Sequence, residues 1–229
     1  MNIFYAPPSQ INNGFIELLD QEAAHASKVL RASEGDKLQI VDGKGGRYEG
    51  LIRRITKKSI QVEIKDHQRV PTSKPELILG MGIIKKRDRL EFAVEKAVEL
   101  GVSKILLFRS DHSIKENVRM DRLESIAVSA MKQSLRAWLP EISLYTSLNK
   151  LVDEMHDAEI LAAHEKVDAA GESFQKKESD KKLLLVGPEG GFSDDEVNMF
   201  RDHGARLVSL GEKRLRTETA VIALLSQFL

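Results

Sequence analysis

A glycine-rich loop between an apolar run and the start of a helix is the feature that most constrains this chain. The run Leu183–Val186 is apolar throughout and predicts a buried strand. The loop Gly187–Gly191 follows, and Ser193 and Glu196 then have the spacing of a capping box, which predicts a helix start. A strand, a glycine-rich loop and a helix in this order are typical of α/β proteins, which bind ligands where their strands end.

The charges beside this loop argue against a phosphate ligand. A helix N-terminus attracts anions through its free N–H groups and its dipole. Here Asp194, Asp195 and Glu196 already place carboxylates in the first turn, and the loop lacks the Lys-Ser/Thr pair of a P-loop. We therefore expect a pocket for a ligand without phosphates, although the glycines can also serve only a tight strand-to-helix turn.

A second polar loop lies downstream. Arg206–Leu210 predicts another short strand, and the polar segment Gly211–Ala220 follows it. An apolar helix then continues toward residue 229, with Thr217 or Thr219 available as its cap. We expect these two strand ends to be adjacent, so that both loops form one crevice.

The pattern of the chain changes near residue 72. Residues 1–70 are rich in short strand signals, which suit a small β-barrel, and Arg69–Pro75 has two prolines that favour a linker. Residues 76–229 alternate strands and helices, which predicts an α/β domain with a mostly parallel sheet covered by helices. The predicted helices are 20–30, 88–100 and 121–138; the predicted strands are 37–41, 47–55, 59–64, 77–84, 104–108, 142–145, 159–163, 183–186 and 206–210; a surface loop is predicted at 167–180.

Composition narrows the function further. With 35 basic and 35 acidic residues the net charge is zero, whereas a nucleic-acid-binding protein usually carries a basic excess. Residues 80–140 nevertheless hold 12 Lys or Arg against 8 Asp or Glu, so a local RNA-binding face is compatible with the sequence, as are ordinary solvated charges. The 6 histidines show no metal-ligand spacing and there are 0 cysteines, so we expect no metal. We expect a cytoplasmic protein, because we find no signal peptide and no membrane-spanning run.

Two C-terminal motifs resemble those of a known family. Gly187-Pro-Glu-Gly-Gly191 and Leu210-Gly-x-x-x-Leu-Arg-Thr-Glu-Thr-Ala220 are similar to the motifs of the bacterial 16S rRNA uridine-N3 methyltransferases, which belong to the SPOUT superfamily. Weaker matches extend the resemblance along nearly the whole chain: His25-x-x-x-Val-Leu-Arg31, Lys96-Ala-Val-Glu-Leu-Gly-Val102 and Gln133-Ser-x-Arg136 with Pro140. One departure is Lys132, where the family pattern has an acidic residue.

The resemblance implies a fold and a cofactor. It implies a SPOUT-type domain with a trefoil knot, an N-terminal PUA-like barrel that binds RNA, a homodimer, and S-adenosyl-L-methionine held by the ends of three neighbouring strands. Glycine suits such a site because its backbone can approach a ligand closely. The residues implied to bind the cofactor are Ala162, Gly187, Pro188, Glu189, Gly190, Gly191, Leu210, Gly211, Leu215, Thr217 and Ala220.

The implied reaction is methylation of N3 of a uridine in 16S rRNA of the 30S subunit, by resemblance uracil 1498 in the usual count. The absence of cysteine agrees with this reaction, because methylation at C5 of a pyrimidine generally needs a covalent nucleophile. Within this hypothesis Arg216 stabilises the charge that develops on the uracil oxygens, and Glu218 accepts the N3 proton. Alternatively, Arg216 and Glu218 simply pair with each other.

The basic residues offer several candidate RNA contacts. His25, Lys28 and Arg31 fall at helical spacing and are predicted to form one patch. Arg87, Arg109 and Arg136 are further candidates for contacts with phosphate. Two other functions stay open: a ribose 2′-O methyltransferase of the same superfamily, and a non-catalytic RNA-binding module for ribosome assembly.

Overall fold

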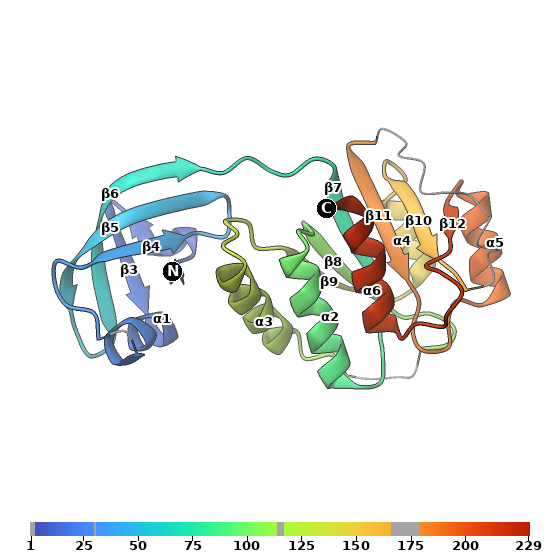
Figure 1. The fold of residues 1–229 in the computed structure, drawn as a ribbon, viewed down its shortest axis with the longest axis horizontal. Helices are drawn as coiled ribbons and strands as arrows, with labels where there is room; N and C mark the ends of the chain where they lie inside the picture. Colours follow the sequence, from blue (N-terminus) through green and yellow to red (C-terminus); the bar gives the residue numbers. More distant parts are fainter. Residues whose placement is uncertain (1–2, 30, 114–116, 166–178) are drawn as a thin grey trace. The chain divides into compact units, whose positions relative to one another are not determined.

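The structure of the chain is a computed structural model, and it describes residues 3–29, 31–113, 117–165 and 179–229 (Figure 1). The chain forms two compact units. Unit 1 comprises Met1–Thr72 with Val128–Leu139, and unit 2 comprises Ser73–Ala127 with Pro140–Leu229. Among the described residues, no helix is long and apolar enough to cross a membrane.

Unit 1 is built on a six-stranded sheet with the order β1-β4-β5-β6-β3-β2. The short β1 pairs with β4 in parallel, and the other pairs are antiparallel. Phe4, Ile16, Leu18, Ile40 and Ile52 are buried in its core. The strands are β1 Ile3–Tyr5, β2 Ile11–Asn12, β3 Phe15–Leu19, β4 Lys37–Val41, β5 Gly46–Ile55 and β6 Ser59–Arg69, and a short 3-10 helix covers Pro8–Gln10.

The predicted helix over residues 20–30 is correct only in its first turn. Asp20–Ala24 form the α-helix α1, but His25–Val29 form a π-helix, and residue 30 lies outside the described residues. A π-helix has more residues per turn than an α-helix, and Arg31 has a left-handed φ of 51°. The α-helical spacing assumed for His25, Lys28 and Arg31 is therefore wrong, and the RNA-binding patch that they were predicted to form stays a prediction.

The helix α3, Met120–Gln133, ends earlier than its apolar pattern predicts. Leu135 has a left-handed φ of 59°, and the Arg136 N–H bonds back to the Met131 carbonyl at 3.0 Å. The chain then bends at Ala137, and Trp138 forms an isolated β-bridge with Lys44. The indole N–H of Trp138 donates to the Val70 carbonyl at 3.0 Å. The pattern missed this ending because the buried side chains continue past the helix.

Segment 128–139 is held in unit 1 by several contacts. Arg47 donates to the Leu135 carbonyl at 2.7 Å, and the Gly45 N–H donates to the Ala137 carbonyl at 2.9 Å. Lys132, the residue that departs from the family pattern, forms a half-buried ion pair with Glu22 of α1. A part of the chain remote in sequence thus completes the packing of unit 1.

Unit 2 is a mixed α/β structure with a parallel sheet, as predicted. Its strands have the order β12-β10-β11-β7-β8-β9, and every neighbouring pair is parallel. The strands are β7 Glu76–Gly82, β8 Lys104–Phe108, β9 Glu141–Tyr145, β10 Glu159–Ala163, β11 Lys181–Val186 and β12 Arg206–Val208. The helices are α2 Arg87–Glu99, α4 Leu148–Glu154, α5 Asp194–Asp202 and α6 Thr217–Leu225, with a 3-10 turn at Ser226–Phe228.

The register of unit 2 brings three strand ends together. Ala163 at the end of β10 pairs with Val186 at the end of β11 and with Val208 at the end of β12. The loops that follow these strands therefore begin at the same end of the sheet. The strands β11 and β12 are not adjacent as predicted, because β10 lies between them. Of the surface loop predicted at residues 167–180, residues 167–178 lie outside the described residues.

We expect Gly45→Ala to destabilise unit 1 more than Gly35→Ala. Both glycines have a φ of 93°, but a Cβ at Gly45 would lie 2.4 Å from the Trp138 ring, whereas a Cβ at Gly35 meets nothing within 4 Å. Both changes carry the left-handed penalty of about 1–2 kcal/mol. The Gly45 variant should lose about 1–3 kcal/mol more because of overpacking. Urea unfolding of both variants measures this difference, and equal losses would contradict the contact with Trp138.

Candidate active site

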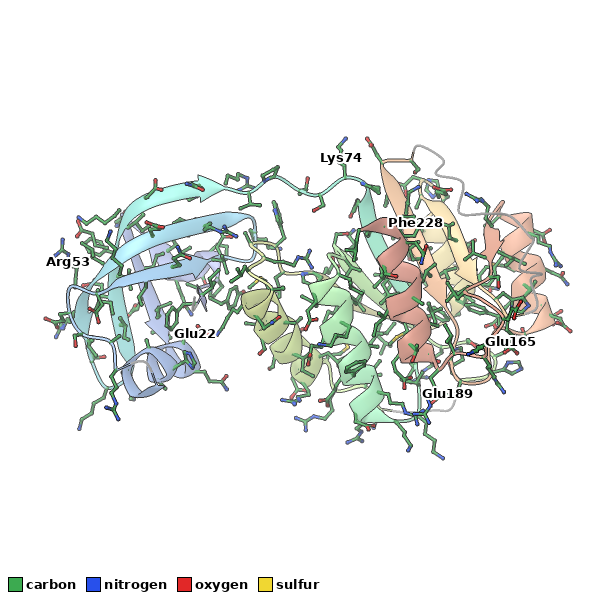
Figure 2. The ribbon with its side chains drawn as sticks, viewed as in Figure 1. Glu22, Arg53, Lys74, Glu165, Glu189 and Phe228 are labelled. Carbon is green, nitrogen blue, oxygen red and sulfur yellow. The ribbon has the colours of Figure 1, made fainter. Side chains whose placement is uncertain are left out.

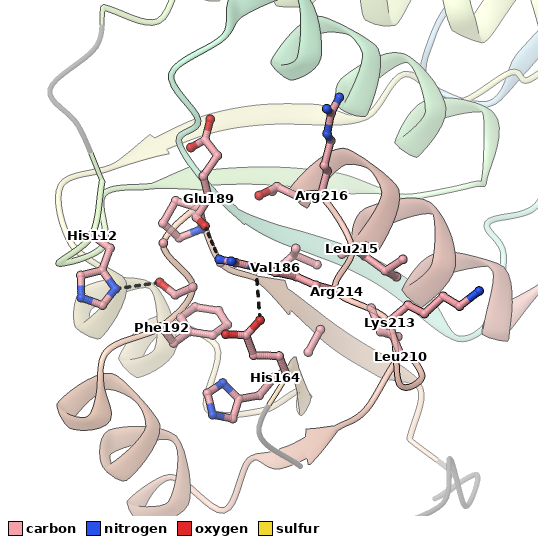
Figure 3. Close-up of a pocket in the computed structure, with 18 of the residues that line it drawn as sticks. His112, His164, Val186, Glu189, Phe192, Leu210, Lys213, Arg214, Leu215 and Arg216 are labelled. Atoms are coloured by element: carbon pink, nitrogen blue, oxygen red, sulfur yellow. Dashed lines mark hydrogen bonds and ion pairs between the residues drawn. The ribbon is translucent and has the colours of Figure 1, made fainter. Parts of the chain in front are cut away.

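A pocket of about 1010 Å³ lies at the edge of unit 2 where β10, β11 and β12 end (Figure 3). Its lining comes from the three loops after these strands, together with one face of α6 and single residues of α2 and of the loop after β8. The lining residues are 163–165, 186–194 and 210–217, with Arg89, His112 and Ala220. Such a position is where open α/β sheets bind their ligands.

Two close contacts of the glycine loop leave no room for a side chain, one at Gly190 of the loop and one at Gly82 of β7, which faces the loop. A Cβ at Gly190 would lie 2.8 Å from the Cβ of His112, and a Cβ at Gly82 would lie 2.6 Å from Pro188. Gly191 and Gly211 have φ values of 71° and 112°, which favour glycine, and no heavy atom lies within 4 Å of where their Cβ would be. The two loops thus present bare backbone to an open space.

Glu196 fixes the glycine loop at its exit. Its carboxylate accepts the Ser193 N–H at 2.9 Å, and the Ser193 hydroxyl accepts the Glu196 N–H at 3.1 Å, so the predicted capping box is confirmed. The second carboxylate oxygen accepts the Asp111 N–H at 3.1 Å, and the Ser193 hydroxyl donates to the Asp111 carboxylate at 2.7 Å. Buried Glu196 therefore ties the loop after β8 to the start of α5.

Sequence reasoning missed the loop after β8 as part of the site. His112 lines the pocket, and its Nδ1 lies 3.3 Å from the Gly191 carbonyl oxygen. Figure 3 shows this ring beside the glycine loop. The position of His112 follows from the pairing of β8 with β7 and from Asp111, and no local motif in the sequence marks it.

Arg214 connects two of the three loops. Its guanidinium donates to the Glu189 carbonyl at 3.5 Å and lies 3.5 Å from the Glu165 carboxylate (Figure 3). Both side chains of this ion pair are largely exposed, with side-chain exposures of 74% and 59%. Such a pair contributes little stability, but it joins the loop after β10 to the loop after β11 across the pocket.

The two residues predicted to be catalytic occupy different environments. Arg216 lies exposed at the N-cap of α6 and lines the pocket. Glu218 is buried, does not line the pocket, and its carboxylate lies 3.5 Å from Nε of Arg89. The alternative in which Arg216 pairs with Glu218 is therefore wrong, because the partner of Glu218 is Arg89.

Ten of the eleven residues predicted to bind the cofactor line the pocket. The exception is Ala162, which is buried in the hydrophobic core. Successive side chains of a strand point to opposite faces of the sheet, so Ala162 points away from the pocket that its neighbour Ala163 lines. The residues that line the pocket as predicted are Gly187, Pro188, Glu189, Gly190, Gly191, Leu210, Gly211, Leu215, Thr217 and Ala220.

The predicted RNA-contacting residues are divided between the two units. Arg87 and Arg109 are exposed in unit 2. Arg136 belongs to unit 1 and is half-buried, and this burial lowers the pKa of its guanidinium from its ordinary value. His25 is exposed and packs edge-on against Phe4. The side chain of Lys28 lies outside the described residues. Among the residues that the structure describes, no group of His, Asp and Glu side chains is arranged to hold a metal ion.

Comparison with known proteins places this fold and pocket in a family. A family described as RNA methyltransferase domain matches residues 71–229, and one described as RNA methyltransferase PUA domain matches residues 18–65. The chain therefore belongs to the RNA methyltransferase family, which confirms the resemblance of its motifs. Ribosomal RNA small subunit methyltransferase E of Rickettsia conorii is 30% identical over 99% of this chain and 94% of that protein.

Solved structures agree with this membership. A probable rRNA-methyltransferase from Porphyromonas gingivalis superposes with a TM-score of 0.89 at 33% identity, covering 99% of this chain and 96% of that one. A ribosomal RNA small subunit methyltransferase E from Neisseria gonorrhoeae, bound to S-adenosyl methionine, has a TM-score of 0.88 at 27% identity and the same coverage. The likeness extends over both compact units.

We expect Glu196→Ala to destabilise unit 2 more than Asp195→Ala. Both residues place a carboxylate in the first turn of α5, but only Glu196 is buried and accepts two backbone N–H groups. Loss of these bonds should cost about 1–3 kcal/mol, whereas loss of the exposed Asp195 should cost less than about 1 kcal/mol. Denaturant unfolding measures both values, and a Glu196 variant as stable as the Asp195 variant would refute the tie to Asp111.

Proposed function

We propose that this protein transfers the methyl group of S-adenosylmethionine to N3 of a uridine in the small-subunit rRNA. The observation that carries the proposal is the pocket formed by two glycine-containing loops, which follow β11 and β12 on either side of β10 at one end of a parallel sheet. Membership of the RNA methyltransferase family and the cofactor bound by the Neisseria relative support it. The chain's lack of cysteine favours nitrogen or oxygen over C5 as the methylated atom.

The residues of the pocket suit this cofactor. Gly191 and Gly211 leave open space where side chains would otherwise project, which admits a flat nucleoside. Asp194, Asp195 and Glu196 at the start of α5 oppose a phosphate but tolerate a sulfonium cation. The backbone of 187–191 and 210–215 would hold the ligand. When bound, S-adenosylmethionine supplies an electrophilic methyl group.

Arg216 is positioned to assist the loss of the uracil proton. As N3 loses its proton, negative charge spreads onto the uracil O2 and O4. Arg216 lies exposed at the pocket and makes no ion pair among the described residues, so its guanidinium is available to such oxygens. A fixed cationic donor of this kind lowers a barrier by about 2.7–4 kcal/mol.

Glu218 is less suited to accept the proton than its place in the motif suggests. It is buried, and its carboxylate faces Arg89 of α2. We propose that this ion pair holds the first turn of α6 against α2, which fixes the backbone of Thr217 and the orientation of Arg216. Glu218 is then a positioning residue.

Several finer features belong to the same proposal. We propose residues 1–70 as a PUA-like barrel that binds RNA and residues 76–229 as the methyltransferase domain, within which the loops at the pocket form a trefoil knot. The return of the chain from the edge strand β12 to α6, which packs against α2 and β11, supports such threading. We also propose a homodimer that acts on the 30S subunit, and Phe92 of α2, 43% exposed, offers apolar surface for it.

Nucleoside analysis tests the proposed reaction, with Arg216→Ala as the diagnostic variant. Unmodified small subunits incubated with wild-type protein and labelled cofactor should yield 3-methyluridine by mass spectrometry. The variant should lower kcat roughly 100- to 1000-fold, while its Kd for the cofactor stays nearly unchanged. A 2′-O-methylated product would favour the ribose enzyme, and absence of cofactor binding would favour the non-catalytic module. An equal loss of binding and rate would contradict the role of Arg216.

Glu218→Gln separates positioning from proton transfer. If Glu218 only pairs with Arg89, the variant should be about 1–3 kcal/mol less stable and should retain methyl transfer within roughly tenfold. A loss of 100-fold or more at unchanged stability would instead identify a general base. Glu91→Gln is the matched control, because Glu91 forms a more exposed pair with Arg122, also involving α2; it should cost less than about 1 kcal/mol.

A further inference from the structure

The basic side chains of unit 2 divide into two groups. Away from the pocket edge most of them face a carboxylate, as Lys96, Arg122, Lys181, Lys182 and Arg206 do. At the pocket edge several do not. Within the part of the chain that the structure describes, no ion pair is formed by Lys85, Lys86, Arg87, Arg109 or Lys213, which are all exposed. We call these five residues the cationic rim.

The rim lies beside the cofactor pocket. The Lys85 N–H donates to the Glu189 carboxylate of the glycine loop at 3.1 Å, and Arg89, two residues beyond Arg87, lines the pocket. Arg109 follows β8 at the same edge, since Gly82 and Phe108 pair at the ends of β7 and β8. Figure 2 shows Glu189 at the end of the sheet where α2 begins. The rim thus continues the mouth of the pocket on the side of α2.

The cationic residues at the N-terminus of α2 do not stabilise this helix. Lys86 is the N-cap, its side chain forms no capping bond, and Arg87 follows it, while Asp88 adds one carboxylate to the first turn. Cations are unfavourable at a helix N-terminus, and Lys is a poor N-cap. By contrast, α4 and α5 begin with Ser147 and Ser193, whose side chains cap them. A local arrangement that opposes helix stability points to a role outside folding.

We propose that the cationic rim binds the phosphates that flank the target nucleotide, which rests on the proposed function. A base can enter the pocket only when it leaves its stack, and its neighbouring phosphates then lie at the mouth. The rim supplies unpaired cations there, while the acidic start of α5 keeps phosphates away from the cofactor loop. This division reconciles RNA binding with a net charge of zero.

The double variant Lys85→Ala with Lys86→Ser tests the rim. Binding of an unmodified small-subunit rRNA transcript should weaken, and the slope of log K against log salt concentration should become shallower by about 1.4–1.8, as expected for two lost phosphate contacts. Cofactor Kd should not change. Because serine caps a helix, the single variant Lys86→Ser should also raise Tm by about 2–4 °C, so weaker RNA binding cannot be attributed to unfolding.

Lys150→Ser is the matched control, because Lys150 is exposed on α4 without an ion pair among the described residues. It should leave the salt slope unchanged. An unchanged slope in the double variant would overturn the rim even if the wild type methylates RNA. A shallower slope in that variant with no methylation by the wild type would overturn the proposed function and keep the rim. Binding of polyglutamate as tight as that of the transcript, lost in the same variant, would overturn RNA as the occupant.

Discussion

The parallel register of β10, β11 and β12 is the constraint on which the site depends. Because Ala163 pairs with both Val186 and Val208, the loops after β10, β11 and β12 begin at the same end of the sheet and line one pocket. The backbone of two of them is exposed through glycine, so ligand recognition rests mainly on N–H and C=O groups fixed by the sheet. Glu196 then holds the glycine loop in place by bonding both to Ser193 and to Asp111.

The N-termini of two helices place opposite charges around this pocket. The first turn of α5 carries three acidic residues, while α2 starts with cations and without a side-chain cap. A ligand without phosphates therefore suits the side of α5, and a polyanion suits the side of α2. Total charge cannot reveal this separation, since 35 basic and 35 acidic residues cancel. Arg216 lies at the start of α6 and lines the same pocket.

Features that depend on neighbouring residues could be predicted from the sequence, and features that depend on distant contacts could not. The capping box at Ser193 and the apolar strands of unit 2 were predictable because each has a local physical cause. The strands β1 and β2 and the helix α4 were missed because each is too short to show a period. The ending of α3 depends on tertiary contacts with Arg47 of β5 and with Val70, and Glu218 pairs with Arg89. No local pattern records these contacts.

Calorimetric titrations with two ligands, S-adenosylmethionine and ATP, test the chemistry of the pocket most directly. If two glycine-containing loops hold an adenosine joined to a sulfonium, and the carboxylates of α5 oppose phosphate, the protein should bind S-adenosylmethionine saturably at one site per chain. ATP at the same concentrations should give no saturable heat. Binding of ATP in preference to S-adenosylmethionine would contradict both the chemistry of the pocket and the reaction inferred from it.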